Sequence, residues 1–175
     1  MTPGDFAFLQ GVLHRSADSD TSMPSLAEIG LNFFVPYLLN RITATWNADL
    51  GGELRKHELT TPQMRALAVL SINSGLTINE LSVLTVTEQS TMSRTLDALE
   101  DRGLVRRKAR AQDMRVREIE ITEAGRAVFA RVWPEMFSRY ETMFRDIDEQ
   151  EFERFVGTLH KLLRNFRKPA GESSE

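Results

Sequence analysis

Residues 77–122 constrain the fold most, because two capped helices are followed there by two strands of alternating apolar and charged residues. Thr77 and Glu80 form a capping box that begins the first helix, which is expected to be short. The second helix begins after Thr87 and stops at Gly103. Two helices in this succession are typical of a helix-turn-helix.

The segment after the second helix changes to a period of two residues. Residues 104–108 and 116–121 alternate apolar and charged side chains, which predicts the two strands of a hairpin. The intervening residues 109–115 are expected to form a loop with a solvated tip. The charged side chains of this loop are Arg110, Asp113 and Arg115. A basic tip of this kind can reach into a groove of DNA.

Positive charge is concentrated around this hairpin. Residues 102–117 contain seven Lys or Arg residues against one acidic residue, a balance of +6, whereas the whole chain has a net charge of −3. A basic segment in an otherwise acidic chain favours a localised contact with phosphates, because each neutralised phosphate releases counterions. The alternative is a charged hairpin that is merely solvated.

Several stretches of the chain resemble the MarR family of bacterial transcriptional regulators. Residues 99–107 follow the family's pattern for the end of the recognition helix. Asp113 and Arg115 match its Asp-x-Arg wing signature, and residues 119–125 match its Thr-x-x-Gly entry into the next helix. Upstream, residues 59–67 are similar to the family's entry into the helix that precedes the pair.

The resemblance covers about residues 26–167. It implies a mainly α protein with a small β-hairpin wing (α+β), in which a winged helix-turn-helix is flanked by N- and C-terminal dimerisation helices. It also implies that Arg115 enters the minor groove, with Asp113 holding that arginine or the loop in shape through a charge-assisted bond. Met114 stands where the family commonly has a second arginine, a departure that weakens phosphate contact at the wing.

The second helix is the candidate for reading bases, because its first turns carry small polar side chains and an arginine. Arg94 is the first candidate, since arginine can donate two hydrogen bonds to one guanine, and Gln89 is the next. Arg107 and Arg110 are expected at phosphates or as solvated charges. The predicted DNA-contacting residues are Thr87, Gln89, Ser90, Thr91, Ser93, Arg94, Arg107, Arg110, Asp113 and Arg115.

The chain divides into five predicted parts. They are an N-terminal extension with a short helix and linker (1–25), an N-terminal dimerisation helix (26–58), the winged helix-turn-helix (59–125), C-terminal dimerisation helices (126–168) and a disordered tail (169–175). Pro36 is expected to bend or split the first long helix, which Gly51 and Gly52 end. Pro134 predicts a kink in the helix after the wing.

The two terminal helical regions are richer in aromatic residues than a winged helix of about 60–70 residues needs to cover itself. Apolar surface left on a monomer predicts a homodimer, as the resemblance also implies; the alternative is that these helices cap their own domain. Recognition helices about 34–36 Å apart in a dimer would read successive major grooves of a near-palindromic operator on double-stranded DNA.

The resemblance further implies an effector, a small aromatic or phenolic acid that binds between the dimerisation helices and the winged domain and releases DNA. His57 and Arg65 are the candidates for meeting its carboxylate. The predicted pocket residues are Phe34, Leu38, Trp46, His57, Met64, Arg65 and Trp133. Each of them has an alternative interpretation as an ordinary core or surface residue.

Composition excludes other classes of function. The chain has no cysteine, which rules out thiol redox sensing, cysteine nucleophiles and cysteine metal sites. Its longest apolar run falls far short of the ~20 residues that span a bilayer, and no signal pattern is present, which predicts a cytoplasmic protein without membrane contact. The three histidines lie in three separate segments and no catalytic motif stands out, so no enzyme, metal or cofactor is expected.

The sequence therefore predicts a DNA-binding transcriptional regulator. Repression is the commoner case by analogy. The remaining alternative is a winged-helix module that binds another protein without binding an operator.

Overall fold

The computed structural model describes residues 25–110 and 113–167, without the side chains of Glu28, Asp113 and Arg167. The elements are α2 (Leu26–Ile29), α3 (Val35–Lys56), α4 (Thr61–Ile72), β1 (Leu76–Thr77), α5 (Ile78–Thr85), α6 (Gln89–Asp101), β2 (Val105–Arg110), β3 (Asp113–Ile121), α7 (Glu123–Met143) and α8 (Glu149–Arg167). The mainly helical fold with a small wing is as predicted. The predicted tail, the extension except Ser25, and the tip of the wing lie outside the described residues.

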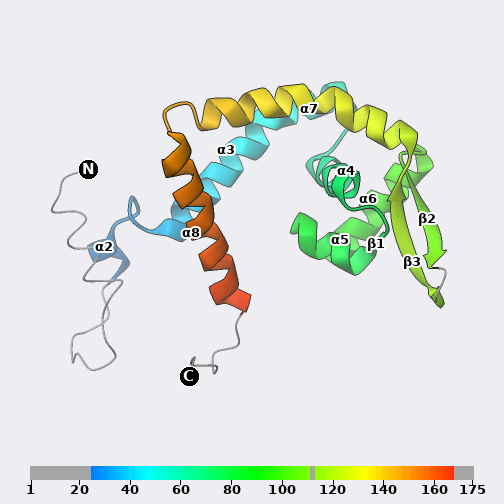
Figure 1. The fold of residues 1–175 in the computed structure, drawn as a ribbon, viewed down its shortest axis with the longest axis horizontal. Coiled ribbons are helices and arrows are strands. Elements are labelled where there is room, and N and C mark those ends of the chain that lie inside the picture. The colour runs from blue at the N-terminus through cyan, green and yellow to red at the C-terminus, as the bar shows by residue number, and fades with distance from the viewer. Residues whose placement is uncertain (1–24, 111–112, 168–175) are drawn as a thin grey trace.

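The elements form two parts, which adjoin at the first turns of α7 (Figure 1). We call α4, β1, α5, α6, β2 and β3 the winged head, and α3, α7 and α8 the long helices. The winged head lies beside the first turns of α7, whereas α8 lies beyond its last turns (Figure 1).

The helix-turn-helix begins as the sequence predicts. The Thr77 side chain accepts a hydrogen bond from the backbone N–H of Glu80, and the Glu80 carboxylate accepts one from the backbone N–H of Thr77 at 2.7 Å. Between α5 and α6, Val86 adopts a left-handed conformation with φ 52°, which lets the chain turn sharply into α6. The predicted pair of helices, the first of them short, is confirmed.

The wing is a longer hairpin than predicted. The sheet order is β1-β3-β2 with antiparallel pairing throughout, and β2 continues to Arg110 while β3 already begins at Asp113. The expected loop over residues 109–115 is therefore wrong, and Arg115 lies in a strand. Cross-strand ion pairs, such as the diagonal pair of Arg110 with Glu118, stabilise the pairing where no apolar alternation signals it.

The first strand, β1, has no counterpart in the sequence prediction. It is two residues long and pairs with Ile119 and Glu118 of β3. Two residues are too few to show a period, so this strand is visible only in the fold.

One apolar core holds the winged head to the adjoining parts of α3 and α7. Its largest fully buried side chains are Leu50, Leu54, Leu67, Leu70, Leu81, Met92, Leu96, Leu99, Val105, Ile119 and Val132. Among the described residues, α8 contributes no buried side chain to this core. The core therefore ends at Met136, before the last two turns of α7.

Two predictions about α3 need correction. Gly51 and Gly52 lie inside the helix, because Leu50 and Leu54 on either side are each 1% exposed and their packing outweighs the low helix propensity of glycine. Pro36 lies in the first turn of α3, where the backbone N–H groups have no partner within the helix, so proline costs no hydrogen bond there. The predicted split therefore lies just before this proline.

The helix after the wing begins as expected, because the Thr122 hydroxyl accepts from the backbone N–H of Gly125 at 3.1 Å. Pro134 lies within α7, which continues to Met143 as one helix. Packing of Val132 and Met136 on the core holds the helix together around the proline.

Candidate DNA interface and effector pocket

The start of α6 presents a polar face to solvent. Gln89, Ser90 and Arg94 are exposed, and Thr91 and Ser93 are half-buried, whereas Met92 lies in the core. Such a division follows from a helix that packs one side on the head and leaves the other for a partner. Five of the predicted DNA-contacting residues are therefore brought together on one helix.

The N-terminus of α6 has no side-chain cap. The half-buried Thr87 precedes it, and its hydroxyl donates to the carbonyl of Thr85 at 3.3 Å. The Ser90 hydroxyl donates to the Glu88 carboxylate at 3.1 Å. Uncapped backbone N–H groups and the positive end of the helix dipole suit a phosphate at this end of α6.

Arg94 and Arg117 carry the most available positive charge in this region. Both are exposed, and neither side chain makes a hydrogen bond or ion pair with another residue in the described part of the chain. Arg117 was not singled out from the sequence, although its place in the alternating strand could have marked it as outward-facing. Two unengaged guanidinium groups suit contact with phosphates or base edges.

Most of the other wing cations are already paired. Arg106 donates to Glu120 at 2.6 Å, Lys108 lies 3.6 Å from the same carboxylate, and Arg110 pairs with Glu118. The Arg106 hydrogen bond lowers the pKa of the Glu120 carboxyl, so this acid is charged beside its partners. Glu118 and Glu120 lie just beyond residues 102–117, so the balance of +6 falls to +4 when it is counted through residue 120. An excess of basic charge remains, but most of it is paired within the wing.

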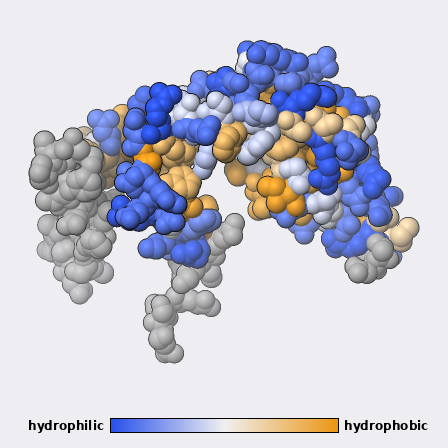
Figure 2. All heavy atoms as spheres, turned by 45° about the horizontal axis from the view of Figure 1, so that its top comes forward, coloured by the Kyte–Doolittle hydropathy of each residue, from blue (hydrophilic) through white to orange (hydrophobic). Residues whose placement is uncertain are grey.

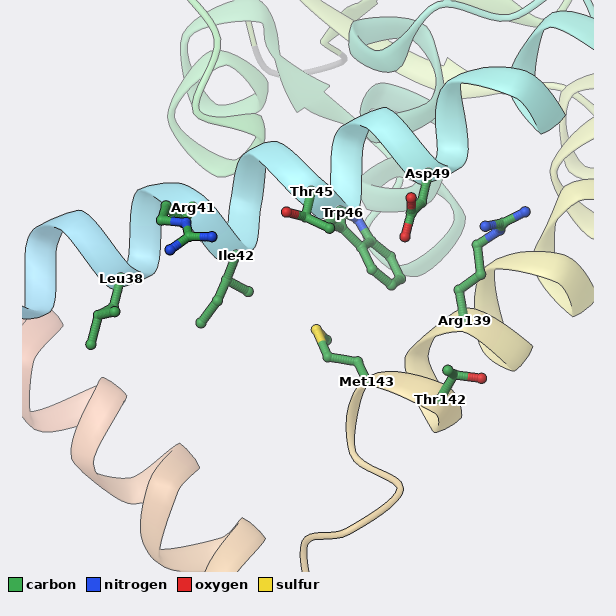
Figure 3. A pocket seen from close by; sticks show the side chains of 9 residues that line it. All are labelled: Leu38, Arg41, Ile42, Thr45, Trp46, Asp49, Arg139, Thr142 and Met143. Carbon is green, nitrogen blue, oxygen red and sulfur yellow. The ribbon is translucent and has the colours of Figure 1, made fainter. Parts of the chain in front are cut away.

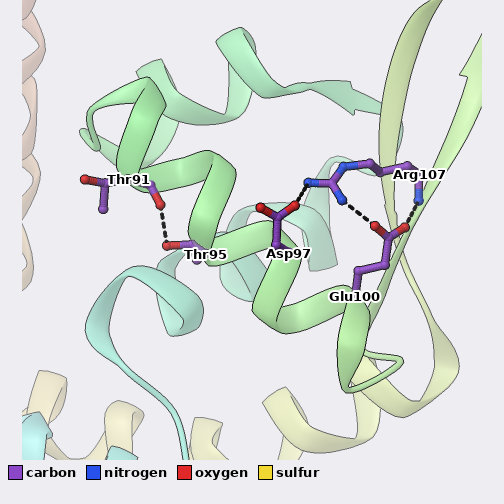
Figure 4. Close-up of polar contacts among 5 residues, drawn as sticks. All are labelled: Thr91, Thr95, Asp97, Glu100 and Arg107. Atoms are coloured by element: carbon purple, nitrogen blue, oxygen red, sulfur yellow. Dashed lines mark hydrogen bonds and ion pairs between the residues drawn. The ribbon is translucent and has the colours of Figure 1, made fainter.

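Arg107 faces α6 rather than solvent. Its guanidinium bonds to Asp97 and Glu100 of α6, as Figure 4 shows. The figure also places Thr91 nearer the start of the helix, where its carbonyl accepts from the Thr95 hydroxyl at 2.8 Å. The arginine expected at a phosphate is thus engaged within the head.

The wing signature is described only in part. Arg115 is exposed in β3 close to the hairpin tip, and Met114 beside it is 72% exposed. The predicted contact of Asp113 with Arg115 depends on a side chain outside the described residues. Arg115 therefore stays a predicted groove contact.

A cavity of about 480 Å³ lies between α3 and α7, within the usual size of a ligand site. Its lining residues, shown in Figure 3, are Leu38, Arg41, Ile42, Thr45, Trp46, Asp49, Arg139, Thr142 and Met143. Of the predicted pocket residues, only Leu38 and Trp46 belong to this lining. Arg41, Thr45 and Asp49 recur every four residues, a helical spacing that could have marked them as one face of α3.

The other predicted pocket residues lie elsewhere. Met64 is in the core, and His57 is 3.6 Å from Glu53 on α3. Arg65 donates to the side-chain oxygen of Asn47 at 3.1 Å, which joins α4 to α3. Phe34 is exposed just before the start of α3, and Trp133 is exposed on α7. These five residues therefore do not form one cavity.

Arg139 gives the cavity a cationic end. Its Nη2 donates to the Glu135 carboxylate at 2.9 Å, while its buried Nε–H has no hydrogen-bond partner in the described part of the chain. The lining also holds Trp46, Met143 and the carboxylate of Asp49, so this end of the cavity combines apolar contact with charged groups of both signs.

Two further findings concern the described residues alone. No group of three His, Asp or Glu side chains there is arranged to hold a metal ion. None of the described helices is both long enough and apolar enough to pass through a membrane.

Comparison with known proteins agrees with this geometry. The sequence profile of the MarR family matches residues 57–115. A MarR-family transcriptional regulator from Silicibacter pomeroyi is 46% identical, and its crystal structure superposes with a TM-score of 0.78 over 84% of this chain and 99% of that one. The HTH-type transcriptional repressor IacR of Pseudomonas putida is 25% identical over 81% of this chain and 85% of its own. The DNA complex of S. aureus MepR has the same fold, with 24% identity and a TM-score of 0.69 over 77% of this chain and 98% of that one.

A winged helix-turn-helix with an exposed polar recognition helix defines a DNA-binding transcriptional regulator. The chain belongs to the MarR family.

Proposed function

We propose that the protein is a homodimeric repressor that binds a near-palindromic operator and is released by a small aromatic or phenolic acid. The observation that carries this proposal is the exposed polar face of α6, with Arg94 unengaged by the other described residues. The MepR structure, which is a DNA complex, and the name of the repressor IacR support DNA binding and repression as the mode of action.

Exposed apolar surface on the long helices supports the dimer. A row of rings runs along α7 through Phe129, Trp133, Phe137, Tyr140 and Phe144, with neighbouring centroids 5.9, 5.9, 6.2 and 5.0 Å apart. In α8, apolar side chains include an 89% exposed Phe166. Figure 2 shows hydrophobic residues reaching the surface at the end of the molecule where α3 and α8 lie. A second copy of the chain would cover this surface and space two recognition helices for one face of DNA.

The cavity between α3 and α7 supports an effector. Trp46 and Met143 offer apolar contact to a ring, and the guanidinium group of Arg139 offers a positive charge to a carboxylate. A ligand wedged between these helices changes the free energy of one arrangement of α3 and α7 relative to another. Because α3 and α7 both pack on the winged head, that preference shifts the spacing of two heads in a dimer.

The first experiment measures binding to a fluorescent duplex from the region beside the protein's own gene, across a series of salt concentrations. Arg94→Ala is expected to lose about 1–3 kcal/mol of binding and to reduce the salt slope, because a base or phosphate contact is lost. Arg106→Ala is the matched control, since Arg106 is exposed but already paired with Glu120. Arg115→Ala tests the wing in the same assay.

Equal and weak binding by all these proteins, blind to sequence, would contradict the operator and favour a protein-binding winged helix. Sedimentation of the same samples checks the dimer. For the effector, 4-hydroxybenzoate is the first probe, and Arg139→Gln should bind DNA normally but lose release by this acid. Release that persists in Arg139→Gln would remove the cavity from the proposal.

A further inference from the structure

Arg107 connects the wing to the recognition helix. Its Nη2 donates to the Asp97 carboxylate at 2.6 Å, and its Nη1 donates to the Glu100 carboxylate. The other oxygen of Glu100 accepts from the backbone N–H of Arg107 at 2.9 Å. One residue of β2 is thus bonded to two successive turns of α6 by three hydrogen bonds (Figure 4).

The remaining ion pairs of the hairpin join different elements. Arg106 and Lys108 meet Glu120, and Arg110 meets Glu118, so these pairs join β2 to β3 within the wing. They strengthen the hairpin but do not fix its direction relative to α6. Of the ion pairs between described side chains of the wing and α6, both are made by Arg107.

Asp97 and Glu100 are costly residues for a surface that meets DNA. Asp97 follows Arg94 by three positions, so the two side chains lie on neighbouring turns of one face of α6. Carboxylates there repel the phosphate backbone, and their replacement by neutral amides would by electrostatics alone strengthen DNA binding. We therefore expect Asp97 and Glu100 to have a structural role whose benefit to DNA binding exceeds this repulsion.

Burial opposes the charged form of Arg107, but its bonds to Asp97 and Glu100 outweigh that effect and raise the pKa of the guanidinium. The side chain is 28% exposed, against 66% for Arg106. A bidentate guanidinium held by two carboxylates is directional, because its donors form a planar fork. This is the geometry of a brace between two elements.

We propose that Arg107 is a positioning residue that fixes the orientation of the wing relative to the recognition helix. The start of α6 and the wing can then contact DNA at the same time. The inference rests on the proposed operator binding. It assigns Arg107 to the orientation of the wing instead of to a phosphate, and gives Asp97 and Glu100 the same task.

The sign of an affinity change separates the two roles. The double variant Asp97→Asn and Glu100→Gln adds two units of positive charge and frees Arg107. If Arg107 served a phosphate, DNA binding would become tighter. If Arg107 braces the wing, the double variant binds the operator about 5–10-fold more weakly despite the added charge. The reason is that the wing then adopts several orientations, and the one that fits DNA is populated only part of the time.

Glu120→Gln is the matched control, because it adds positive charge on the wing without touching the brace. It should bind DNA as tightly as the parent or more tightly. Arg107→Lys is the second variant: it keeps the charge that a phosphate contact needs but loses the planar fork, and should weaken binding as the double variant does. Tighter or unchanged binding by the double variant, or full binding by Arg107→Lys, would overturn the brace.

A measurement without DNA separates this inference from the proposed function. Amide hydrogen exchange over residues 105–110 of the full-length protein should become faster in the double variant, since the Arg107 N–H loses its charged acceptor. Unchanged exchange would overturn the brace even if an operator is bound. Faster exchange in a protein whose parent binds no duplex would support the brace and contradict the operator.

Discussion

The winged head and α8 bury their apolar side chains to very different extents. The head packs almost every large apolar residue of α6 and its sheet into one core, with Leu96 and Leu99 fully buried. In α8, by contrast, Leu163 and Phe166 are more than half exposed. The core of the head is complete within one chain, although Ile72, Val83 and Val86 of the head are exposed, whereas α8 presents an apolar surface that a second chain can cover.

The same contrast holds for charge. In the head, Arg106, Arg107 and Arg110 are paired with carboxylates of the head itself. This leaves the exposed Arg94 and Arg117 as the cations most available for a partner. A head whose other cations are paired internally can commit a few side chains to recognition, because those pairs hold the supporting structure in place.

The largest expected effect uses two glycines, one in each region. A Cβ on Gly125 would lie 2.1 Å from the backbone oxygen of Leu104, whereas a Cβ on Gly157 of α8 meets no atom within 4 Å. Gly125→Ala should therefore cost more than about 3 kcal/mol of unfolding free energy, because backbone must move. Gly157→Ala should stabilise its helix by about 0.5–1 kcal/mol. Urea denaturation measures both, and equal effects would abolish the contrast.

The next effect tests the exposed surface. Leu163→Glu places a charge on the apolar face of α8 and should weaken a dimer by at least the ~1.5–3 kcal/mol of burying one leucine. Val83→Glu is the control, since Val83 is a 71% exposed apolar residue of the head. Sedimentation equilibrium should show dissociation for Leu163→Glu alone. Dissociation by Val83→Glu instead would move the interface to the head.

Features that depend on residues close together in the sequence could be predicted, whereas features that depend on contacts between distant segments could not. Caps at Thr77 and Thr122 are local, and their hydrogen bonds lie where the pattern placed them. The continuation of α3 through Gly51 was missed, because it depends on a core built from distant elements.

The candidate site divides in the same manner. The polar face of α6 follows from helical periodicity, so its residues could be predicted together. The pairing of Arg107 with Asp97 could not, since it joins a strand to a helix whose relative direction no local pattern specifies. Arg139 was missed in the pocket for the same reason: it meets Trp46 only when α7 lies across α3.

A smaller effect concerns the contact between the two regions. Arg102, at the end of α6, donates to the carbonyl of Glu58 at 2.6 Å and to that of His57 at 3.4 Å, just after α3. Arg102→Ala should cost about 1–2 kcal/mol of stability, since bonds to a charged donor are lost at a partly exposed site. Thermal unfolding measures this. If an effector acts through α3, its effect on DNA affinity should also shrink in this variant, and an unaltered effect would show that Arg102 does not couple the regions.

The smallest expected effect is on the pH dependence of stability, and it compares Glu80 of the head with Glu53 of α3. The backbone N–H of Thr77 lowers the pKa of Glu80 in the head, and the hydrogen bond from Lys56 lowers the pKa of Glu53 on α3. Because each pKa is lower in the folded protein, each acid stabilises the fold above the ordinary glutamate pKa, and this contribution is lost as pH falls through the folded value. Glu80→Gln and Glu53→Gln should each flatten the acid decline of the melting temperature.

Salt should separate these two acids. Lys56 is 70% exposed, so its pairing with Glu53 is screened at about 1 M salt, where the Debye length is about 3 Å. The bond of Glu80 to a backbone N–H is held by the helix start itself and should persist. Melting curves between low pH and neutrality, at low and high salt, should therefore show the Glu80→Gln effect at both and the Glu53→Gln effect only at low salt. Loss of both effects in salt would mean that the capping box of the head is no better ordered than an ion pair on the surface of a long helix.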